Sequence, residues 1–99
     1  MRRIVVETAR VLETADRIEE AKEEYKRLYF ELYDRVDLLA GVWTGADNQK
    51  FTTKIKSYED DFRRISVIMM QYVDFLRHSA KAYASTQEEL INQAEHLKT

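Results

Sequence analysis

The chain has 99 residues, which is enough for one domain and too few for two of ordinary size. Its 16 Lys and Arg against 18 Asp and Glu give a net charge of −2, which argues against a nucleic-acid-binding protein because such surfaces are usually strongly basic. Cysteine and proline are absent and glycine occurs twice, which excludes disulfides, thiol nucleophiles and cysteine-held zinc and favours about one turn.

The first residues carry no pattern of a secretory leader. Three apolar residues, Ile4 to Val6, separate a basic pair from Glu7, whereas the hydrophobic region of a leader has roughly 7–15. Uncharged stretches such as 65–73 are shorter than the ~18 residues of a transmembrane helix. We therefore expect no transmembrane segment, and expect that the protein, if it leaves the cytoplasm, does so without a cleaved signal peptide.

A 3.5-residue apolar repeat predicts the first helix, over about 5–41. Positions stepped alternately by four and three from Ile4 to Trp43 are apolar or aromatic at ten of twelve places. A repeat of this length is typical of long helices that pack at a shallow angle. Lys22 interrupts the stripe, and we expect its stem to lie along apolar neighbours or to help set the register.

Both glycines lie where the repeat breaks, and we expect a Trp-x-Gly turn at about 42–46. Trp43 is expected to be buried there, filling the space where the helices diverge. Gly45 would permit a positive φ angle. Thr44 would cap the second helix, and Asp47 would lie near its positive N-terminus.

The second helix is predicted over about 47–90, because the same stepping from Phe51 to Leu90 is again apolar or aromatic at ten of twelve places. Folded back on the first helix, it should be covered only to about residue 83, which leaves a tail to 99 partly free. The sequence therefore predicts an all-α protein: a single helical-hairpin domain over 1–99, with two antiparallel helices.

Both helices carry more apolar surface than one hairpin can bury. Nine of twelve residues in 65–76 and five of six in 28–33 are apolar or aromatic. Such surfaces mark a partner site, and two hairpins packed face to face would form a four-helix bundle. The residues that we expect at this dimer interface are Leu28, Phe30, Val67, Met70, Tyr72 and Val73.

Side chains that could carry chemistry are few. Asp74 and His78 lie one helical turn apart, but no nucleophile stands beside them, so a surface ion pair is the expected arrangement. The chain has no Glu-x-x-His pair of the kind found in di-iron bundles and no phosphate-binding loop. We therefore expect no enzyme, and no catalytic, cofactor-binding or metal-binding residues.

Trp43, Thr44 and Gly45, placed between two long helices of a chain of this length, resemble the WXG-motif family, the ESAT-like small proteins of type VII secretion systems. Phe51 stands where that family usually has an aromatic residue, and the β-branched opening, Ile4–Thr8, is similar to the family's start. The resemblance covers the whole chain. It implies a non-enzymatic secretion substrate, or a co-secreted accessory protein, that acts through helical-bundle protein binding.

The resemblance also implies an export signal near the end of the second helix. In the family, a Tyr or Phe is followed four residues later by Asp or Glu. Here Tyr83 is followed by Gln87, and Glu88 comes one residue later. A glutamine keeps the shape of the acidic residue and loses its charge, which favours a co-secreted accessory protein over a substrate exported alone.

The implied partners are a second copy, a similar small helical protein or the helical N-terminal region of a larger secreted protein, together with the secretion machinery. The implied location is outside the cell or at its surface. Two alternatives stay open. One is a targeting or chaperone-like partner of a larger helical-headed toxin, with no export signal of its own. The other is an intracellular coiled-coil adaptor dimer in which Trp-x-Gly is coincidental.

Overall fold

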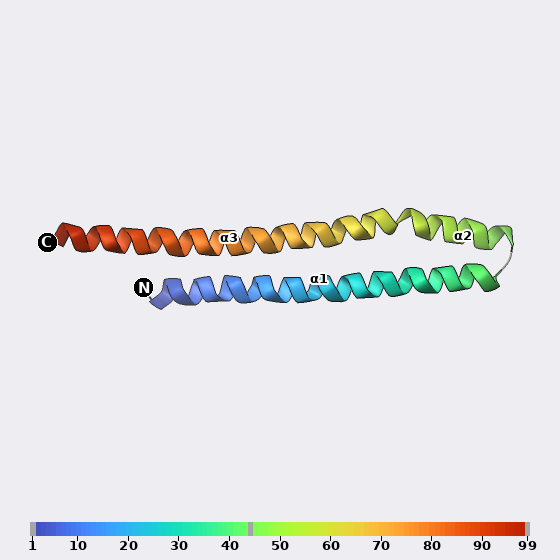
Figure 1. Ribbon diagram of the computed structural model, residues 1–99, viewed down its shortest axis with the longest axis horizontal. Helices are drawn as coiled ribbons and strands as arrows, with labels where there is room; N and C mark the ends of the chain where they lie inside the picture. Colours follow the sequence, from blue (N-terminus) through green and yellow to red (C-terminus); the bar gives the residue numbers. More distant parts are fainter. Residues whose placement is uncertain (1, 44, 99) are drawn as a thin grey trace.

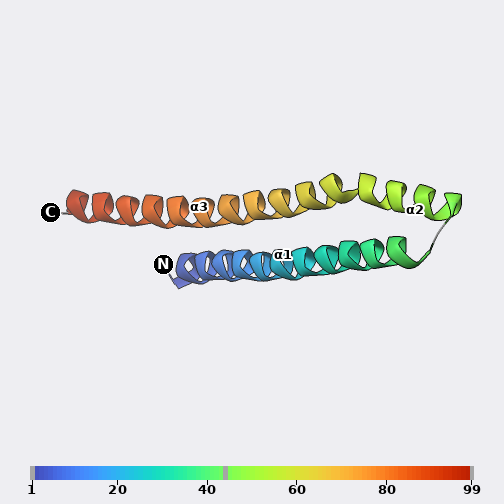
Figure 2. The same ribbon diagram turned by 45° about the vertical axis from the view of Figure 1, so that its right-hand side comes forward.

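The computed structural model describes residues 2–43 and 45–98, which form a long antiparallel helical hairpin (Figure 1). Helix α1 spans Arg2–Val42, α2 spans Ala46–Ser57 and α3 spans Glu59–Lys98. Helices α2 and α3 follow one another back along α1, and the two layers stay side by side in both views (Figures 1 and 2). The hairpin measures 83 × 17 × 13 Å. The predicted all-α fold and antiparallel arrangement are confirmed.

The second half of the hairpin is broken at Tyr58, where the sequence predicts one continuous helix. The Tyr58 amide donates to the carbonyl of Ile55 (3.1 Å), and the Phe62 amide donates to the carbonyl of Tyr58 (3.0 Å). The Ser57 hydroxyl donates to the backbone carbonyl three residues earlier, a local bond that competes with the helical ladder. Acidic residues at 59–61 favour a helix N-terminus just after the break.

At the open end of the hairpin, the first and the last helix both extend further than predicted. Helix α1 begins at Arg2 rather than near residue 5, and α3 continues to Lys98 rather than ending near residue 90. Because α1 starts early, its first turns cover α3 as far as Ile91, which lines a groove together with Val5. The expected limit of cover at about residue 83 is therefore wrong. Only the end of α3 projects past the start of α1 (Figure 1).

The line of contact between the helices, here called the seam, consists of buried and half-buried residues at helical spacing. On α1 they are Thr8, Val11, Ala15, Ile18, Lys22, Tyr25, Tyr29, Tyr33 and Val36. On α2 and α3 they are Asn48, Thr52, Ile55, Phe62, Ser66, Met69, Val73, Leu76, Ala80, Ala84, Gln87 and Ile91. Many are small, which lets the two helices approach closely. Val73 is fully buried.

Two tyrosines of α1 tie the helices together on either side of the break. The Tyr33 hydroxyl donates to the carbonyl of Ile55 (2.7 Å), before the break. The Tyr25 hydroxyl donates to the carbonyl of Phe62 (3.0 Å), after it. Burial raises the pKa of both hydroxyls. The rings of Tyr25 and Tyr33 also pack on the Phe62 ring, each with a centroid separation of 6.2 Å.

On α3 the seam keeps Phe62, Met69 and Leu76 of the predicted stripe, but at the alternate positions it lies one residue later than the sequence predicts. The predicted stripe places Ile65 and Tyr72 against the first helix, whereas Ser66 and Val73 lie there. Helix α3 carries two apolar stripes side by side, and the stripe with the smaller side chains allows the closer approach. The large side chains of the other stripe are consequently exposed: Ile65, Tyr72, Tyr83 and Leu90.

The seam position of Val73 can be tested by truncation. We expect Val73→Ala to lower the free energy of unfolding by about 2 kcal/mol, because it leaves a cavity in the most tightly packed part of the seam. Val67→Ala is the matched control, because it makes the same change in helix propensity as Val73→Ala but at an exposed site. We expect it to lower the free energy of unfolding by less than about 0.5 kcal/mol. Urea denaturation followed by circular dichroism measures both; equal losses would place Val73 outside the core.

Candidate functional site

The hairpin has two broad faces, one on each side of the seam. In an antiparallel pair of helices, residues one position after a seam residue lie on one face, and residues one position before lie on the other. Among the described residues, the ion pairs between α1 and the returning helices all join positions just after the seam. We call this side the ion-pair face and the opposite side the apolar face.

The ion-pair face is held by cross-helix charges. The Arg77 guanidinium of α3 lies 2.9 Å from the carboxylate of Asp16 and 2.5 Å from that of Glu19, both on α1. The hydrogen bonds that Arg77 donates to Glu19 and Asp16 raise the pKa of its guanidinium. Nearer the turn, the Lys56 amine lies 3.1 Å from the carboxylate of Asp37. Partly exposed pairs of this kind contribute little stability each, but they fix how the two helices lie side by side.

The apolar face carries a stripe of large side chains along α3. Ile65, Ile68, Tyr72 and Phe75 follow one another at steps of three and four residues, and all are exposed. The rings of Tyr72 and Phe75 stack, with their centroids 6.4 Å apart. On α1 the same face carries exposed Leu28 and Leu32, which precede the seam residues Tyr29 and Tyr33. An exposed apolar surface of this kind marks a binding site for another protein.

Four of the six predicted interface residues are divided between the two faces. Leu28 and Tyr72 lie on the apolar face. Phe30 and Val67 are equally exposed, but each follows a seam residue and so lies on the ion-pair face. No single partner surface of the hairpin therefore contains all four.

Of the other two predicted interface residues, Val73 is wrong and Met70 is only partly accessible to a partner. Val73 is fully buried in the seam. Met70 is half-buried, and its sulfur lies 3.6 Å from the amine of Lys22. The cause is that the seam passes through Ser66 and Val73 instead of Ile65 and Tyr72, which turns both side chains toward α1. The Lys22 side chain is 12% exposed, and its amine reaches the carboxylate of Glu23 (2.9 Å), which lowers the pKa of Glu23.

The turn places Trp43 and Phe51 together, with their ring centroids 6.1 Å apart. The indole is 43% exposed, so the expectation that it would be buried is wrong. The two helices do not diverge around it, because the space beneath the turn is filled by Asn48, which is buried. The aromatic pair is therefore a half-exposed surface at the end of the hairpin.

Asn48 is a structural residue that the sequence reasoning missed. Its side-chain amide donates to the carbonyl of Trp43 at the end of α1, and its side-chain oxygen accepts from the Thr52 hydroxyl (3.2 Å). An Asn in the first turn of a helix after a glycine turn is the signal that could have revealed it. Gly45 has a φ of 134°, as expected, and the predicted cap Thr44 lies outside the described residues.

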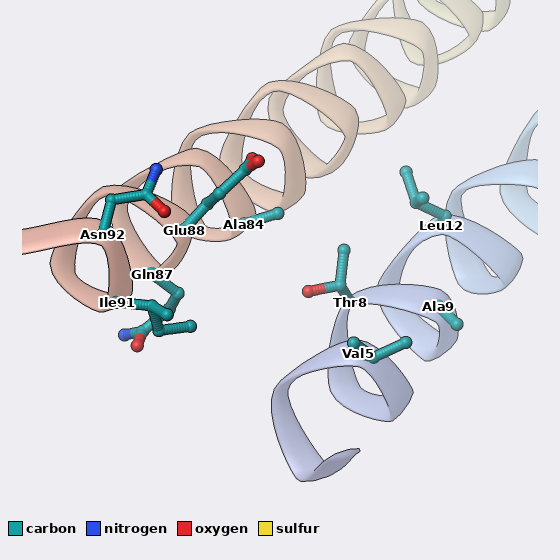
Figure 3. A pocket seen from close by; sticks show the side chains of 9 residues that line it. All are labelled: Val5, Thr8, Ala9, Leu12, Ala84, Gln87, Glu88, Ile91 and Asn92. Carbon is teal, nitrogen blue, oxygen red and sulfur yellow. The ribbon is translucent and has the colours of Figure 1, made fainter. Parts of the chain in front are cut away.

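An apolar groove of about 420 Å³ lies at the open end of the hairpin, on the ion-pair side (Figure 3). It is lined from α1 by Val5, Thr8, Ala9 and Leu12, and from α3 by Ala84, Gln87, Glu88, Ile91 and Asn92. The buried Thr8 hydroxyl has no hydrogen-bond partner among the residues that the structure describes.

The three predicted export-signal residues are not presented together. Tyr83 is exposed and lies on the apolar face. Gln87 is half-buried and lines the groove, because the first turns of α1 lie against it (Figure 3). Glu88 is exposed at the groove's edge. Sequence spacing placed Tyr83 and Gln87 on one free face, whereas Gln87 belongs to the seam and Tyr83 lies beside the seam.

The chain matches no protein-family model, no curated protein and no solved structure.

Within residues 2–43 and 45–98, no three His, Cys, Asp or Glu side chains are grouped closely enough to hold a metal ion. Asp74 and His78 are exposed, and the described ion pairs do not include one between them. No helix in the described ranges is both long and apolar enough to cross a membrane.

The two glycines offer a matched test of the turn. We expect Gly45→Ala to destabilise the protein by about 1–3 kcal/mol, because its backbone occupies a region that only glycine adopts readily. We expect Gly41→Ala, within α1, to stabilise it by up to about 1 kcal/mol. The added Cβ atom would meet no neighbour at either site, so steric clashes do not contribute. The difference in thermal unfolding between the two variants therefore reports the backbone conformation alone. A stable Gly45→Ala protein would contradict the positive φ.

Proposed function

We propose that this protein is a non-enzymatic, partner-binding helical hairpin of the WXG type, which acts as a type VII secretion substrate or co-secreted accessory protein. One observation carries the proposal. Among the described residues, six apolar side chains are buried and nineteen large ones are exposed. A chain of this size is marginally stable even with a complete core, so this distribution favours a protein whose remaining apolar surface is covered by a partner.

The turn supports the WXG part of the proposal. Gly45 stands where the backbone requires a glycine, and Trp43 packs on Phe51 across the turn. Trp43 and Phe51 remain 43% and 42% exposed, so both are accessible to a partner. We propose that this aromatic pair is a recognition surface for a partner or for the secretion machinery, since half-exposed aromatic rings are frequent anchors in protein interfaces.

The end of α3 supports export with a partner over export alone. Tyr83 is accessible, whereas Gln87 lies half-buried against the start of α1. An acidic side chain at position 87 would be partly removed from water in an apolar groove, which costs free energy. We therefore propose that this chain contributes Tyr83 to export and that its partner contributes the acidic part of the signal.

The two other functions remain distinguishable from this one. A targeting or chaperone-like partner of a larger toxin would bind the toxin's helical head and stay behind or leave with it. An intracellular adaptor would never appear in the medium, whatever genes accompany it. Dependence of export on the secretion ATPase separates the adaptor from a co-secreted accessory protein. Dependence of export on Tyr83 separates the chaperone-like partner, which has no export signal of its own.

The export proposal is tested at Tyr83. In a host with a type VII system, we expect Tyr83→Ala to reduce the protein in the medium to the level of a cytoplasmic marker, and Tyr83→Phe to retain export. Both variants should keep the helical circular dichroism of the unmodified protein, since the side chain is exposed. Immunoblots of culture supernatants, with and without the secretion ATPase, measure the effect. Unchanged export of Tyr83→Ala would refute a role for this residue, and export independent of the ATPase would refute the proposed pathway.

A further inference from the structure

We infer that α2 is a conformational switch, which unfolds and refolds as a unit while α1 and α3 stay paired. Only its folded state holds Trp43 and Phe51 together. The switch rests on the proposed function in one respect only, namely that this aromatic pair serves as a recognition surface.

Helix α2 contributes little to the interior of the hairpin. Asn48 is the one buried residue among Ala46–Ser57, all of which the structure describes. The other two seam residues of α2, Thr52 and Ile55, are half-buried, so two of its three seam positions are polar. On α3, by contrast, the fully buried Val73 is apolar. Segments with few buried apolar contacts have the lowest free energies of local unfolding.

The break at Tyr58 separates α2 from α3. The Tyr58 amide donates to the carbonyl of Ile55, three residues earlier instead of four, which interrupts the regular α-helical ladder. Helix formation is cooperative along an unbroken ladder. Helix α2 also has favourable charges of its own, with Asp47 in its first turn and Lys54 and Lys56 in its last. It therefore folds and unfolds as one unit, without requiring α3 to follow.

Unfolding of α2 does not pull α1 and α3 apart. Its 12 residues span about 18 Å as a helix, at a rise of about 1.5 Å per residue. The same residues reach up to about 40 Å when extended at about 3.3 Å each. An unfolded α2 therefore still connects the end of α1 to the start of α3, while the seam from Phe62 onward keeps its contacts.

Two polar contacts hold α2 in its folded state. The Tyr33 hydroxyl donates to the carbonyl of Ile55 (2.7 Å), and the Asn48 amide donates to the carbonyl of Trp43. A single hydrogen bond of this kind shifts a folding equilibrium by only about 2–10-fold. The unfolded state of α2 is consequently a minor but populated one, in the range of about 0.1–10% of molecules.

The state of α2 decides whether the aromatic surface exists. Trp43 follows the end of α1, whereas Phe51 lies on α2, and their ring centroids are 6.1 Å apart in the folded state. When α2 unfolds, Phe51 leaves Trp43. A partner that contacts both rings therefore binds only the folded state and shifts the equilibrium toward it.

Native-state hydrogen exchange followed by NMR tests the switch with two matched variants. We expect the α2 amides to be protected at least about 100-fold less than those around Val73. Tyr33→Phe removes the bond to Ile55 and should lower protection throughout α2 by a further factor of about 2–10. Tyr25→Phe removes the corresponding bond to Phe62, beyond the break, and should leave α2 protection unchanged.

Three results of this experiment overturn the switch. Equal protection in α2 and α3 would mean that the hairpin opens only as a whole. A complete lack of protection in α2 would mean that its folded state is not populated. An equal loss of α2 protection in Tyr25→Phe and Tyr33→Phe would mean that the break at Tyr58 does not isolate α2.

Fluorescence gives a second test, because Trp43 is the single tryptophan of the chain. In urea, we expect its emission to change at a lower concentration than the helical circular dichroism, since α2 unfolds before α1 and α3 separate. Tyr33→Phe should widen the gap between the two transitions, and Tyr25→Phe should narrow it. Coincident transitions in all three proteins would show that the hairpin is one cooperative unit.

The switch and the proposed function fail in different ways, because both tests use the purified chain and involve no export. A hairpin that unfolds as one unit but is exported through the secretion ATPase would overturn the switch and leave the proposed function standing. A chain whose α2 unfolds separately but which never leaves the cell would do the reverse.

Discussion

Two helices that touch along one line can each bury only one stripe of side chains, and this limit governs the whole molecule. The stripe that α3 gives to α1 contains Ser66, Val73 and Ala80, whose small side chains bring the helices close together. The larger apolar residues of α3 are then left over, because no other part of the chain can reach them. The hairpin therefore satisfies its polar backbone internally, while large apolar side chains of α3 such as Ile68, Tyr72 and Phe75 remain at the surface.

The same limit makes the two faces chemically different. On one face, Arg77 and Lys56 reach across the seam to carboxylates on α1, and the long charged side chains cover the joint between the helices. On the other face no such bridge is present in the described part of the chain, and Ile68, Tyr72 and Phe75 stand exposed. The apolar stripe of α3 is therefore suited to bind a partner, and the ion-pair face also exposes single apolar side chains, among them Phe30 and Val67.

The turn and the break control how these faces are presented. Asn48 closes the end of α1 by pairing with the carbonyl of Trp43, which leaves the Trp43 ring on the surface. Tyr33 and Tyr25 hold the backbone before and after Tyr58, so that α2 can bend while both segments stay on α1. These are specific polar contacts at a few positions, and they set the register on which the faces depend.

The sequence by itself determined the hairpin. The 3.5-residue repeat, the absence of proline and the glycines at one break leave no other economical fold, and Gly45 was assigned its positive φ from the same pattern. Periodicity could not decide which of two neighbouring stripes on α3 faces α1. For that reason Met70 and Val73 were assigned to the outside, and Gln87 to a free face, although α1 lies against all three. Only the packed structure decides between such stripes, because the choice depends on how closely two surfaces can approach, and a repeat in one helix does not contain that information.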